Sequence, residues 1–365
     1  MYEHDNRIVM TLDAGGTNLV FSAIQSNRQV VEPISIPASH DSLESCLRSI
    51  IKGFTEVKKK LATTPAAISF AFPGPADYER GIIGDLPNFP SFRGGVALKA
   101  MLEKEFGLSV FINNDGNLFA YGEALCGFLP YINGKLKEAG NPKQYRNLLA
   151  VTLGTGFGAG VVIDNVLLTG DNGCGGDTWL ARNKRYPNLI AEESVSIRAV
   201  VNRYIALSGE KVDKLTPKDV FEIAEGTKAG NKISAIQSFE ELGEVLGATI
   251  AQALNIVDGI VVIGGGLAGA SKYIMPSVVK ELRTNLYLNN GTPIPILQSD
   301  AYDLTDEKDI ASFVKDETSV VKVPFSDETV VYHEAKKVGV AVTQIGTSHA
   351  VSLGAYAFAL NSLGE

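Results

Sequence analysis

The segment LDAGGTN, at residues 12–18, places a carboxylate and two glycines between two apolar runs. Its residues that could do chemistry are Asp13, Gly15, Gly16, Thr17 and Asn18. Glycines let backbone N–H groups approach an anion because no Cβ stands in the way. The carboxylate is an acceptor only and suits a hydrated Mg²⁺, which keeps several of its waters. A plain Gly-Gly hairpin, with the aspartate capping its own turn, is the alternative interpretation.

A second polar segment, FINNDGN at residues 111–117, ends a predicted strand just before a predicted helix. Asn113, Asn114 and Asp115 would supply donors, acceptors and one base, which is the set that a polyhydroxyl ligand needs. The alternative is that Asp115 caps the helix that starts at about residue 116. Asn88, in the segment LPNFP, adds another amide between two prolines, and an ordinary turn is its alternative.

Two more glycine-rich segments follow apolar runs. GTGFGAG, residues 154–160, leads into another predicted strand, whereas a dinucleotide fingerprint must open a helix. Its Gly154, Thr155 and Gly156 still suit contact with phosphate. GGGLAG, residues 264–269, follows a strand and precedes a predicted helix, which favours a dinucleotide-dependent oxidoreductase as a rival function. The sequence contains no Walker A motif, which excludes a P-loop kinase.

The first and second glycine-rich segments have similar surroundings. VMTLDAGGTNLVFSAI and AVTLGTGFGAGVVI both read as an apolar run, Thr-Leu, a turn of small residues and another apolar run, about 140 residues apart. This pattern indicates a duplicated unit of two strands. We therefore expect two related domains with a cleft between them.

The remaining elements follow from hydrophobic periodicity and turn residues. Strands are predicted at residues 7–12, 18–24, 30–36, 66–72, 110–113 and 259–263. Helices are predicted at residues 41–61, 190–206, 216–228, 235–255, 270–284 and 349–360. Asp41, with Glu44 three residues later, is the expected N-cap of the first helix. Asp164-Asn165 is a predicted two-residue hairpin turn, and residues 300–335 are an expected insertion.

Composition limits the functions that the chain can have. It has 365 residues, 45% of them hydrophobic, and a net charge of −8, which disfavours a broad nucleic-acid or anionic-membrane surface. No apolar run reaches about 18 residues and no signal peptide is visible, so we expect a cytoplasmic protein that neither spans a membrane nor binds nucleic acid. The three scattered cysteines fit reduced thiols.

The ordered set DAGGTN, PGP, LPNFP, NNDGN, LGTGFGAG and GGGLAG resembles the ROK family of repressors, open reading frames and sugar kinases. The resemblance spans nearly the whole chain. It implies a two-domain α/β fold of the actin-like ATPase (ribonuclease H-like) type, with a duplicated domain that contains a β-hairpin and an interdomain cleft. The expected domains are residues 1–117 with the C-terminal helix 348–365, and residues 118–347 with the insertion.

The resemblance also implies roles for single residues. Asp13 would help to hold Mg²⁺ through water, near the phosphates of ATP. Phosphate and nucleotide contacts would come from Gly15, Gly16, Thr17, Asn18, Gly154, Thr155, Gly156, Gly264, Gly265 and Gly266. Asn88 and Asn114 would bind sugar hydroxyl groups. Asp115 would be the base that takes a proton from the attacking hydroxyl.

The chain departs from the family pattern after the second hairpin. Family kinases carry a GEIGH-like segment that supplies a glutamate and a histidine to the sugar, and this chain has GCGGDTW instead. Asp177 or the glycine before it replaces the glutamate, and Trp179 falls in the place of the histidine. That histidine binds zinc in many members, and the cysteine cluster that follows is also absent, so we predict no structural zinc. Glu192, four residues before Ser196, matches a sugar-contacting glutamate of the family, although Glu193 competes for that alignment.

We therefore expect an ATP- and Mg²⁺-dependent kinase that phosphorylates a hexose or an amino sugar, like a glucokinase. About seven residues precede the first predicted strand, which leaves no room for the DNA-binding module of the repressor branch. A homodimer stays open. The alternatives are a non-catalytic relative that senses a sugar or nucleotide, and the dinucleotide-dependent oxidoreductase.

Overall fold

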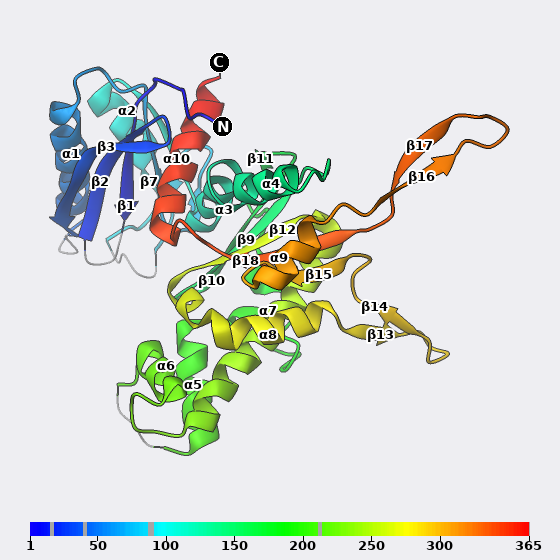
Figure 1. Ribbon diagram of the computed structural model, residues 1–365. Helices are drawn as coiled ribbons and strands as arrows, with labels where there is room; N and C mark the ends of the chain where they lie inside the picture. Colours follow the sequence, from blue (N-terminus) through cyan, green and yellow to red (C-terminus); the bar gives the residue numbers. More distant parts are fainter. Residues whose placement is uncertain (15–17, 39–41, 87–90, 211–213, 365) are drawn as a thin grey trace. The chain divides into compact units, whose positions relative to one another are not determined.

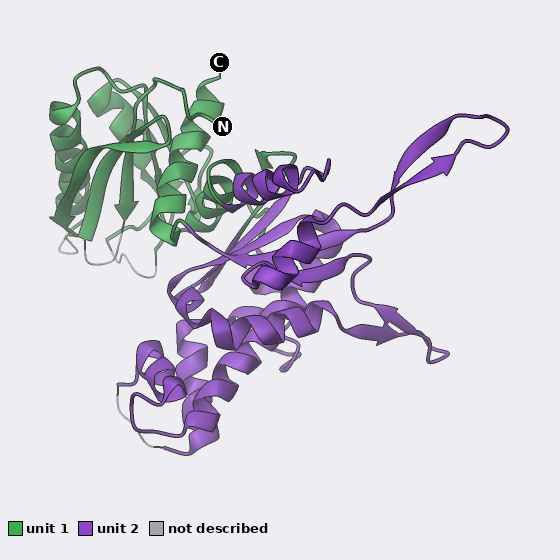
Figure 2. Ribbon diagram, viewed as in Figure 1, with its two compact units in different colours: residues 1–127, 160–176, 345–365 green, residues 128–159, 177–344 purple. Residues whose placement is uncertain are grey.

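The computed structural model describes residues 1–14, 18–38, 42–86, 91–210 and 214–364. The chain forms two compact units, coloured separately in Figure 2. Unit 1 comprises Met1–Gly127, Gly160–Gly176 and Ile345–Glu365, and unit 2 comprises Phe128–Ala159 and Asp177–Gln344. Residues 118–127 and 160–176 thus group with unit 1, whereas the sequence placed them in the second domain.

Unit 1 is built on a five-stranded sheet with the order β3-β2-β1-β4-β8 (Figure 1). Its strands are β1 (Val9–Ala14), β2 (Asn18–Gln25), β3 (Arg28–Pro37), β4 (Ala67–Ala71) and β8 (Ser109–Asn113). β1 and β2 are antiparallel, with Val9 opposite Ile24, whereas β1, β4 and β8 run parallel. The carboxyl ends of these parallel strands meet at one edge of the sheet, where ligands of open α/β sheets bind.

A six-stranded sheet has the order β11-β10-β9-β12-β18-β15. Its strands are β9 (Leu148–Leu153), β10 (Phe157–Ile163), β11 (Val166–Leu167), β12 (Ile260–Gly264), β15 (Asp300–Asp303) and β18 (Lys337–Val342). β12 runs parallel to both β9 and β18. A hairpin followed by parallel strands therefore occurs twice in the chain, which confirms the duplicated unit. The boundary between the two compact units runs through β10.

Helices and smaller strands complete both units. The helices are α1 (Leu43–Lys60), α2 (Leu98–Phe106), α3 (Asp115–Leu125), α4 (Phe128–Glu138), α5 (Ile197–Ser208), α6 (Pro217–Glu225), α7 (Lys232–Val257), α8 (Ser271–Leu282), α9 (Glu307–Val314) and α10 (Thr347–Leu363). Short 3-10 helices are η1 (Thr178–Leu180), η2 (Ala191–Glu193) and η3 (Gly266–Ala270). The small strands are β5 (Ala76–Asp77), β6 (Ile82–Ile83), β7 (Val96–Ala97), β13 (Asn285–Tyr287), β14 (Pro293–Pro295), β16 (Thr318–Lys322) and β17 (Thr329–His333).

The core of unit 1 forms where α1 covers its sheet. Cys46, Ile50, Phe54 and Val57 recur at helical spacing and are all buried. The ring of Phe54 lies 5.1 Å from that of Phe21 on β2, centroid to centroid, in an edge-on contact. Aromatic pairs in this geometry stabilise a core beyond the apolar area that they bury.

Close helix packing anchors α3, the helix that begins at Asp115. α10 packs along α3, and the two helices approach so closely that a Cβ at Gly122 would overlap the carbonyl oxygen of Ala350. A Cβ at Gly354 would overlap the carbonyl oxygen of Leu118 in the same way. Glycine is required at both positions because the backbones themselves are in contact.

Most predicted elements are present, with shifted ends. The N-cap of α1 is Ser42, whose side chain accepts from Ser45 N, so the prediction of Asp41 as the cap was wrong. Ser and Asp are equally good caps, and the sequence alone does not rank neighbours. Asp164 and Asn165 both have positive φ, as the predicted hairpin turn requires. Among the described residues, no helix is both long and apolar enough to span a bilayer.

Replacing Gly354 with alanine should destabilise the protein by roughly 1–3 kcal/mol, because the new methyl group forces α3 and α10 apart. Gly134→Ala, inside α4, is the matched control: open space surrounds its Cβ position, so helix propensity predicts a gain of roughly 0.5–1 kcal/mol. Thermal unfolding measures both. Equal melting temperatures for the two variants would contradict this account of the helix contact.

Candidate functional site

The carboxyl edge of the unit 1 sheet carries Asp13, near the end of β1, where it pairs with Val20 on β2. Its side chain is exposed and has no hydrogen-bond or ion-pair partner among the described residues. Asn18, the first residue of β2, is also exposed. A free carboxylate at this edge fits a hydrated Mg²⁺, which needs only one or two carboxylates from the protein.

The junction of β8 and α3 lies at the same edge and carries Asn114 and Asp115. Asn114 is the N-cap of α3, and its Oδ1 accepts from the backbone N–H groups of Gly116 at 2.7 Å and Asn117 at 3.3 Å. The alternative in which Asp115 caps the helix is therefore wrong. Asp115 Oδ1 accepts one further bond from the shared Gly116 N–H at 2.9 Å. The cap leaves most of the Asp115 carboxylate available.

Asp115 lies in surroundings that favour its neutral form. Protein atoms packed around this carboxyl desolvate it and raise its pKa above the ordinary value of 3.8, although the residue as a whole is exposed to solvent. The Gly116 N–H bond opposes the shift, and the negative charge of Asp13 adds to it. A carboxylate with a raised pKa is a stronger base, which suits proton transfer from a hydroxyl group.

Four predicted residues lie outside the described part of the chain. They are Gly15, Gly16, Thr17 and Asn88. Their roles stay predictions. The other predicted residues of unit 1, namely Asp13, Asn18, Asn114 and Asp115, lie at one edge of a single sheet.

Unit 2 carries the second glycine-rich turn between β9 and β10. Gly154 N donates to Gly156 O at 3.0 Å, which closes the turn, and Ile197 N of α5 donates to Gly154 O at 2.8 Å. Thr155 is exposed at the tip, and no atom lies near the Cβ position of Gly154. The turn therefore presents open backbone and one hydroxyl group, as phosphate contact requires.

The third glycine-rich segment lies beside this turn, because β12 and β9 are parallel neighbours. Gly264 ends β12, and Gly265 has a φ of 87° and lies so close to Leu153 of β9 that a side chain would overlap its backbone. Gly266 has open space at its Cβ position. Gly265 thus serves backbone packing, whereas Gly266 leaves room for a ligand.

The side chain of Glu192 binds the backbone that follows the second glycine-rich turn. Its Oε2 accepts from Phe157 N at 3.0 Å, and a Cβ at Gly156 would lie 2.7 Å from the same oxygen. Its Oε1 pairs with Arg198 Nη2 at 3.0 Å, and Arg198 also binds the rival residue Glu193. Glycine at position 156 therefore makes room for the carboxylate. The predicted sugar contact of Glu192 stays untested.

Two other residues of this region have polar groups without partners among the described residues. Asp177 is exposed at the start of η1 and makes no side-chain capping bond. Ser196 is fully buried at the start of α5, and its hydroxyl group has no hydrogen-bond partner. Ser196 lies directly before the residue that holds Gly154.

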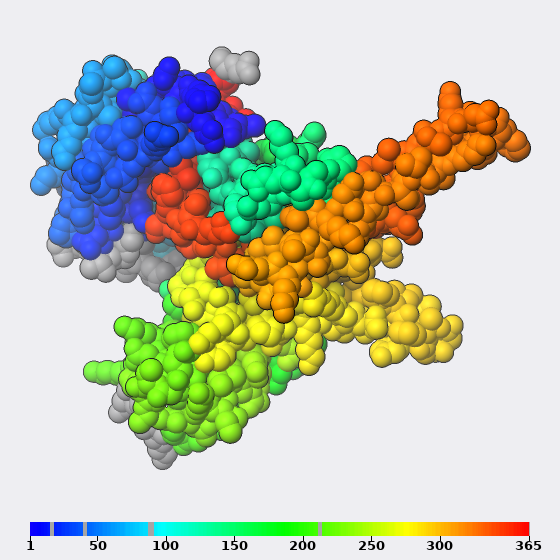
Figure 3. Space-filling model, in the orientation of Figure 1, coloured from blue at the N-terminus to red at the C-terminus, as the bar shows by residue number. Residues whose placement is uncertain are grey.

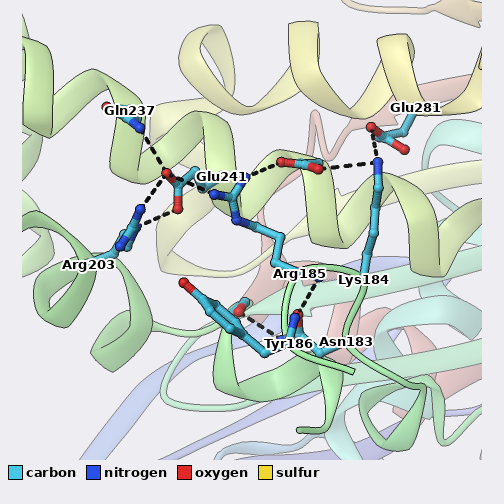
Figure 4. Close-up of polar contacts among 10 residues, drawn as sticks. Asn183, Lys184, Arg185, Tyr186, Arg203, Gln237, Glu241 and Glu281 are labelled. Carbon is cyan, nitrogen blue, oxygen red and sulfur yellow. Dashed lines mark hydrogen bonds and ion pairs between the residues drawn. The ribbon is translucent and has the colours of Figure 1, made fainter. Parts of the chain in front are cut away.

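The segment of residues 181–190 is held by polar contacts (Figure 4). Asn183 Oδ1 accepts from the backbone N–H groups of Arg185 at 3.0 Å and Tyr186 at 3.1 Å. Asn183 Nδ2 donates to Ile190 O at 3.2 Å and to Ser194 Oγ at 2.8 Å. One buried amide thus closes the loop on itself and ties it to the segment that contains Glu192.

Ion pairs attach the same loop to α7 and α8 (Figure 4). Lys184 Nζ lies 2.7 Å from Glu281 Oε1 of α8, and Arg185 pairs with Glu244 and Glu241 of α7. Although desolvation opposes the shift, hydrogen bonds from Arg185 and Lys184 lower the pKa of Glu244. We call Lys184, Arg185, Arg203, Glu241, Glu244 and Glu281 the charged network. It joins this loop to two helices.

Within the described ranges, no three His, Cys, Asp or Glu side chains cluster as a metal site would require. The absence of structural zinc stays a prediction.

Sequence reasoning missed the charged network because its partners lie up to 97 residues apart. It also missed that Asn113, Asn117 and Tyr121 face one cavity, although their spacing of four residues was visible.

Comparison with known proteins identifies relatives. The model of the ROK family matches residues 9–305. A solved glucokinase from Parabacteroides distasonis is 54% identical, covers 99% of this chain and 99% of its own, and has a TM-score of 0.89. The glucokinase of Thermotoga maritima is 26% identical in an alignment of 302 positions that covers 73% of this chain and 88% of that protein.

A more distant solved structure shows the same fold. The ROK family glucokinase from Streptomyces griseus, in complex with glucose and AMPPNP, is 18% identical and covers 96% of this chain and 98% of its own, with a TM-score of 0.61. These comparisons confirm the predicted actin-like ATPase fold. They also remove the dinucleotide-dependent oxidoreductase as an alternative.

Replacing Arg185 with methionine should lower the free energy of unfolding by roughly 1–3 kcal/mol, because Glu241 and Glu244 each lose a charged partner. Arg48→Met, which breaks an exposed pair with Glu44 on α1, should cost less than about 0.5 kcal/mol.

A chelator such as EDTA should leave the melting temperature of the unaltered protein unchanged. A lower melting temperature after chelation would show that a metal, and not the charged network, holds the loop.

Proposed function

Because this chain belongs to the ROK family and is a sugar kinase of that family, we propose that it transfers the γ-phosphoryl group of ATP to a hydroxyl group of a hexose or an amino sugar. Asp115 is the general base. The observation that supports this role is the capping of α3 by Asn114, which leaves the Asp115 carboxylate uncommitted at the edge where ligands bind.

Asp115 accepts the proton of the attacking hydroxyl group as the new O–P bond forms and the bond to the leaving diphosphate breaks. Its raised pKa makes it a stronger base than an ordinary carboxylate, which favours transfer of this proton. The free amide N–H₂ of Asn114 can donate to a neighbouring hydroxyl group, since only its oxygen is used for the cap. Positioning of this kind is most of what phosphoryl transfer asks of a protein.

Nucleotide contacts are proposed for residues of unit 1 and, separately, for residues of unit 2. Asp13 would hold Mg²⁺ through water, and the metal when bound neutralises negative charge on the phosphate oxygens. Asn18 with Gly15, Gly16 and Thr17 contacts phosphate in this proposal. In unit 2, Gly154, Thr155 and Gly156 do the same, while Gly264, Gly265 and Gly266 border the adenosine. Support for ATP comes from the AMPPNP complex of the Streptomyces griseus relative.

Glucose is the first substrate to test, because the relative that is 54% identical is named a glucokinase. Asn88, Asn114, Asp177 and Glu192 are the proposed sugar contacts. The carboxylate of Glu192 already has two partners, Phe157 N and Arg198 Nη2. It would therefore contact the sugar while it remains bound to the glycine-rich turn. Asp177 has no such commitment, and in this proposal it takes the place of the family glutamate, for which the glycine before it is the alternative.

The test is Asp115→Asn with ATP, Mg²⁺ and a panel of glucose, mannose, fructose, allose and N-acetylated hexosamines, followed by coupled ADP release. Loss of the base should reduce kcat by about 10²- to 10⁴-fold on the preferred sugar. Asp327→Asn, at a fully exposed carboxylate of the β16–β17 turn, should retain full activity.

Full turnover by Asp115→Asn would contradict its role as base. Sugar binding by the unaltered protein without ADP formation on any sugar of the panel would instead favour the sensing relative. The two results are distinguishable, because the first requires an active unaltered protein and the second is seen when the unaltered protein forms no ADP.

A homodimer belongs to this proposal, and two projecting hairpins of unit 2 support it (Figure 3). Ten large apolar side chains on them are 38 to 110% exposed: Leu286, Tyr287, Leu288, Ile294, Val320, Val321, Phe325, Val330, Val331 and Tyr332. Adjacent valines point to opposite faces of a strand, so both faces of β16–β17 are apolar. An isolated two-stranded ribbon of this kind is marginally stable in water.

The exposed area is large enough for a dimer. At roughly 150–250 Å² for a large aromatic side chain and less for an aliphatic one, these side chains expose on the order of 1,000 Å². Stable interfaces bury about 800 Å² on each partner. A second copy of this chain, which carries the same two hairpins, therefore suffices to cover them.

Light scattering should give the mass of a dimer for the unaltered protein. The double variant Val321→Lys, Val331→Lys places one charge on each face of β16–β17 and should give a monomer. Val30→Lys, at an exposed position of β3, should leave the dimer intact. A monomeric parent protein would contradict this part of the proposal.

A further inference from the structure

Unit 1 contains a cavity of about 620 Å³ that the proposed kinase chemistry does not use. All of its lining residues belong to unit 1. They come from β5 and the turn after it, from β8, α3 and α10, and from the segment that contains β11 and Gly173. A volume of this size is within the range of small-molecule sites.

Three buried polar side chains form the floor of the cavity. Asn113 and Tyr121 are each 2% exposed and Asn117 is 6% exposed. Asn113 Oδ1 accepts from Asn114 N at 2.8 Å and from Asn117 Nδ2 at 3.0 Å, which fixes the orientation of both amides. Tyr121 contacts Phe358 of α10 edge-on, with centroids 6.5 Å apart.

Each floor residue retains an unused hydrogen-bonding group. Among the described residues, Asn113 Nδ2, Asn117 Oδ1 and the Tyr121 hydroxyl group have no hydrogen-bond partner. None of the three atoms is shut off from solvent as a buried unpaired group would be, so water or a ligand in the cavity can reach each of them. A donor, an acceptor and a hydroxyl group that all line one cavity offer a ligand three groups with which to pair.

The cavity lies on the side of α3 away from Asp115. Asn117 and Tyr121 are four residues apart and share one face of the helix. Asp115 precedes Asn117 by two positions, which is about 200° around the helix axis, and it does not line the cavity. Binding here is therefore separable from catalysis.

The charges around the cavity select the kind of ligand. Its lining carries Asp77, Glu79 and Asp171 against a single cation, Arg80, so the local formal charge is −3 + 1 = −2. Arg80 is moreover paired with Asp77 at 3.0 Å. Phosphates and other anions are repelled. Desolvation raises the pKa of Tyr121 to about 12, so its phenol stays neutral and can both donate and accept.

We propose that this cavity is a second ligand site, for a neutral polyhydroxy compound of the size of a mono- or disaccharide. Hydroxyl groups donate and accept at once, so adjacent hydroxyl groups can pair with the Asn113 amide N–H and the Asn117 oxygen together. Phe358 and Leu167 provide apolar surface for the ring face of a sugar. Asn113 directly precedes Asn114 and Asp115, so an occupant would contact the backbone segment that positions the base.

The test measures binding to the full chain without ATP, by calorimetry and equilibrium dialysis. The probes are glucose, sucrose, trehalose and glucose 6-phosphate. At least one neutral sugar should bind at a site that Tyr121→Phe weakens by roughly tenfold, because one buried hydrogen bond is lost. Glucose 6-phosphate should not bind at that site. Tyr131→Phe, on α4, is the matched control and should change nothing.

A second variant blocks the cavity without touching its floor. Asn361 is exposed on α10, and Asn361→Trp should fill the entrance and abolish the same binding event while kcat is retained. Identical binding of every neutral sugar to the unaltered protein and both variants would overturn the proposal, as would the absence of any binding beyond the kinase site. Loss of activity in Asp115→Asn leaves these results unaffected, so failure here is distinct from failure of the proposed function.

Discussion

The cap that Asn114 places on α3 is the interaction on which the candidate site depends. Its single side-chain oxygen satisfies two backbone N–H groups at the start of the helix, and either residue of the pair Asn-Asp could have done so. Because the amide takes this role, the carboxylate next to it is not needed for folding. Asp115 thus becomes a group whose charge the surroundings disfavour, which is a common property of catalytic acids and bases.

The rest of unit 1 holds that junction in place. β8 continues the row of parallel strands that begins with β1, so Asp13 and Asp115 follow strands that end at the same edge. α10 packs against α3 with direct backbone contact at Gly122 and Gly354. Unit 2 repeats the same strand arrangement, but there the edge carries glycines in place of acids. The two copies of one strand arrangement therefore carry different groups: carboxylates in one, and open glycine backbone in the other.

Sequence reasoning predicted what depends on local patterns. The hairpins, their duplication and the Asp164-Asn165 turn follow from period-two runs and turn residues within short windows. It failed where chemistry allows equal choices, as between Asp41 and Ser42 as the cap of α1, and it left open whether Asp115 caps α3. It also could not predict the charged network, because Lys184 and Glu281 meet only after α7 and α8 have packed. The close approach of Glu192 to Gly156 was equally unpredictable, because these residues also meet only in the folded chain.

Because the surroundings of Asp115 disfavour its charged form, folding should become less favourable once this group ionises, and the melting temperature of Asp115→Asn relative to the unaltered protein tests this across pH. A protein in which folding raises the pKa of a carboxyl group loses stability as the pH rises above that group's ordinary pKa of 3.8. Asparagine keeps the acceptor for Gly116 N–H and removes the charge. The variant should therefore melt at a higher temperature than the parent at pH 7, and the difference should vanish toward pH 3. A variant that melts lower at pH 7 would contradict the account.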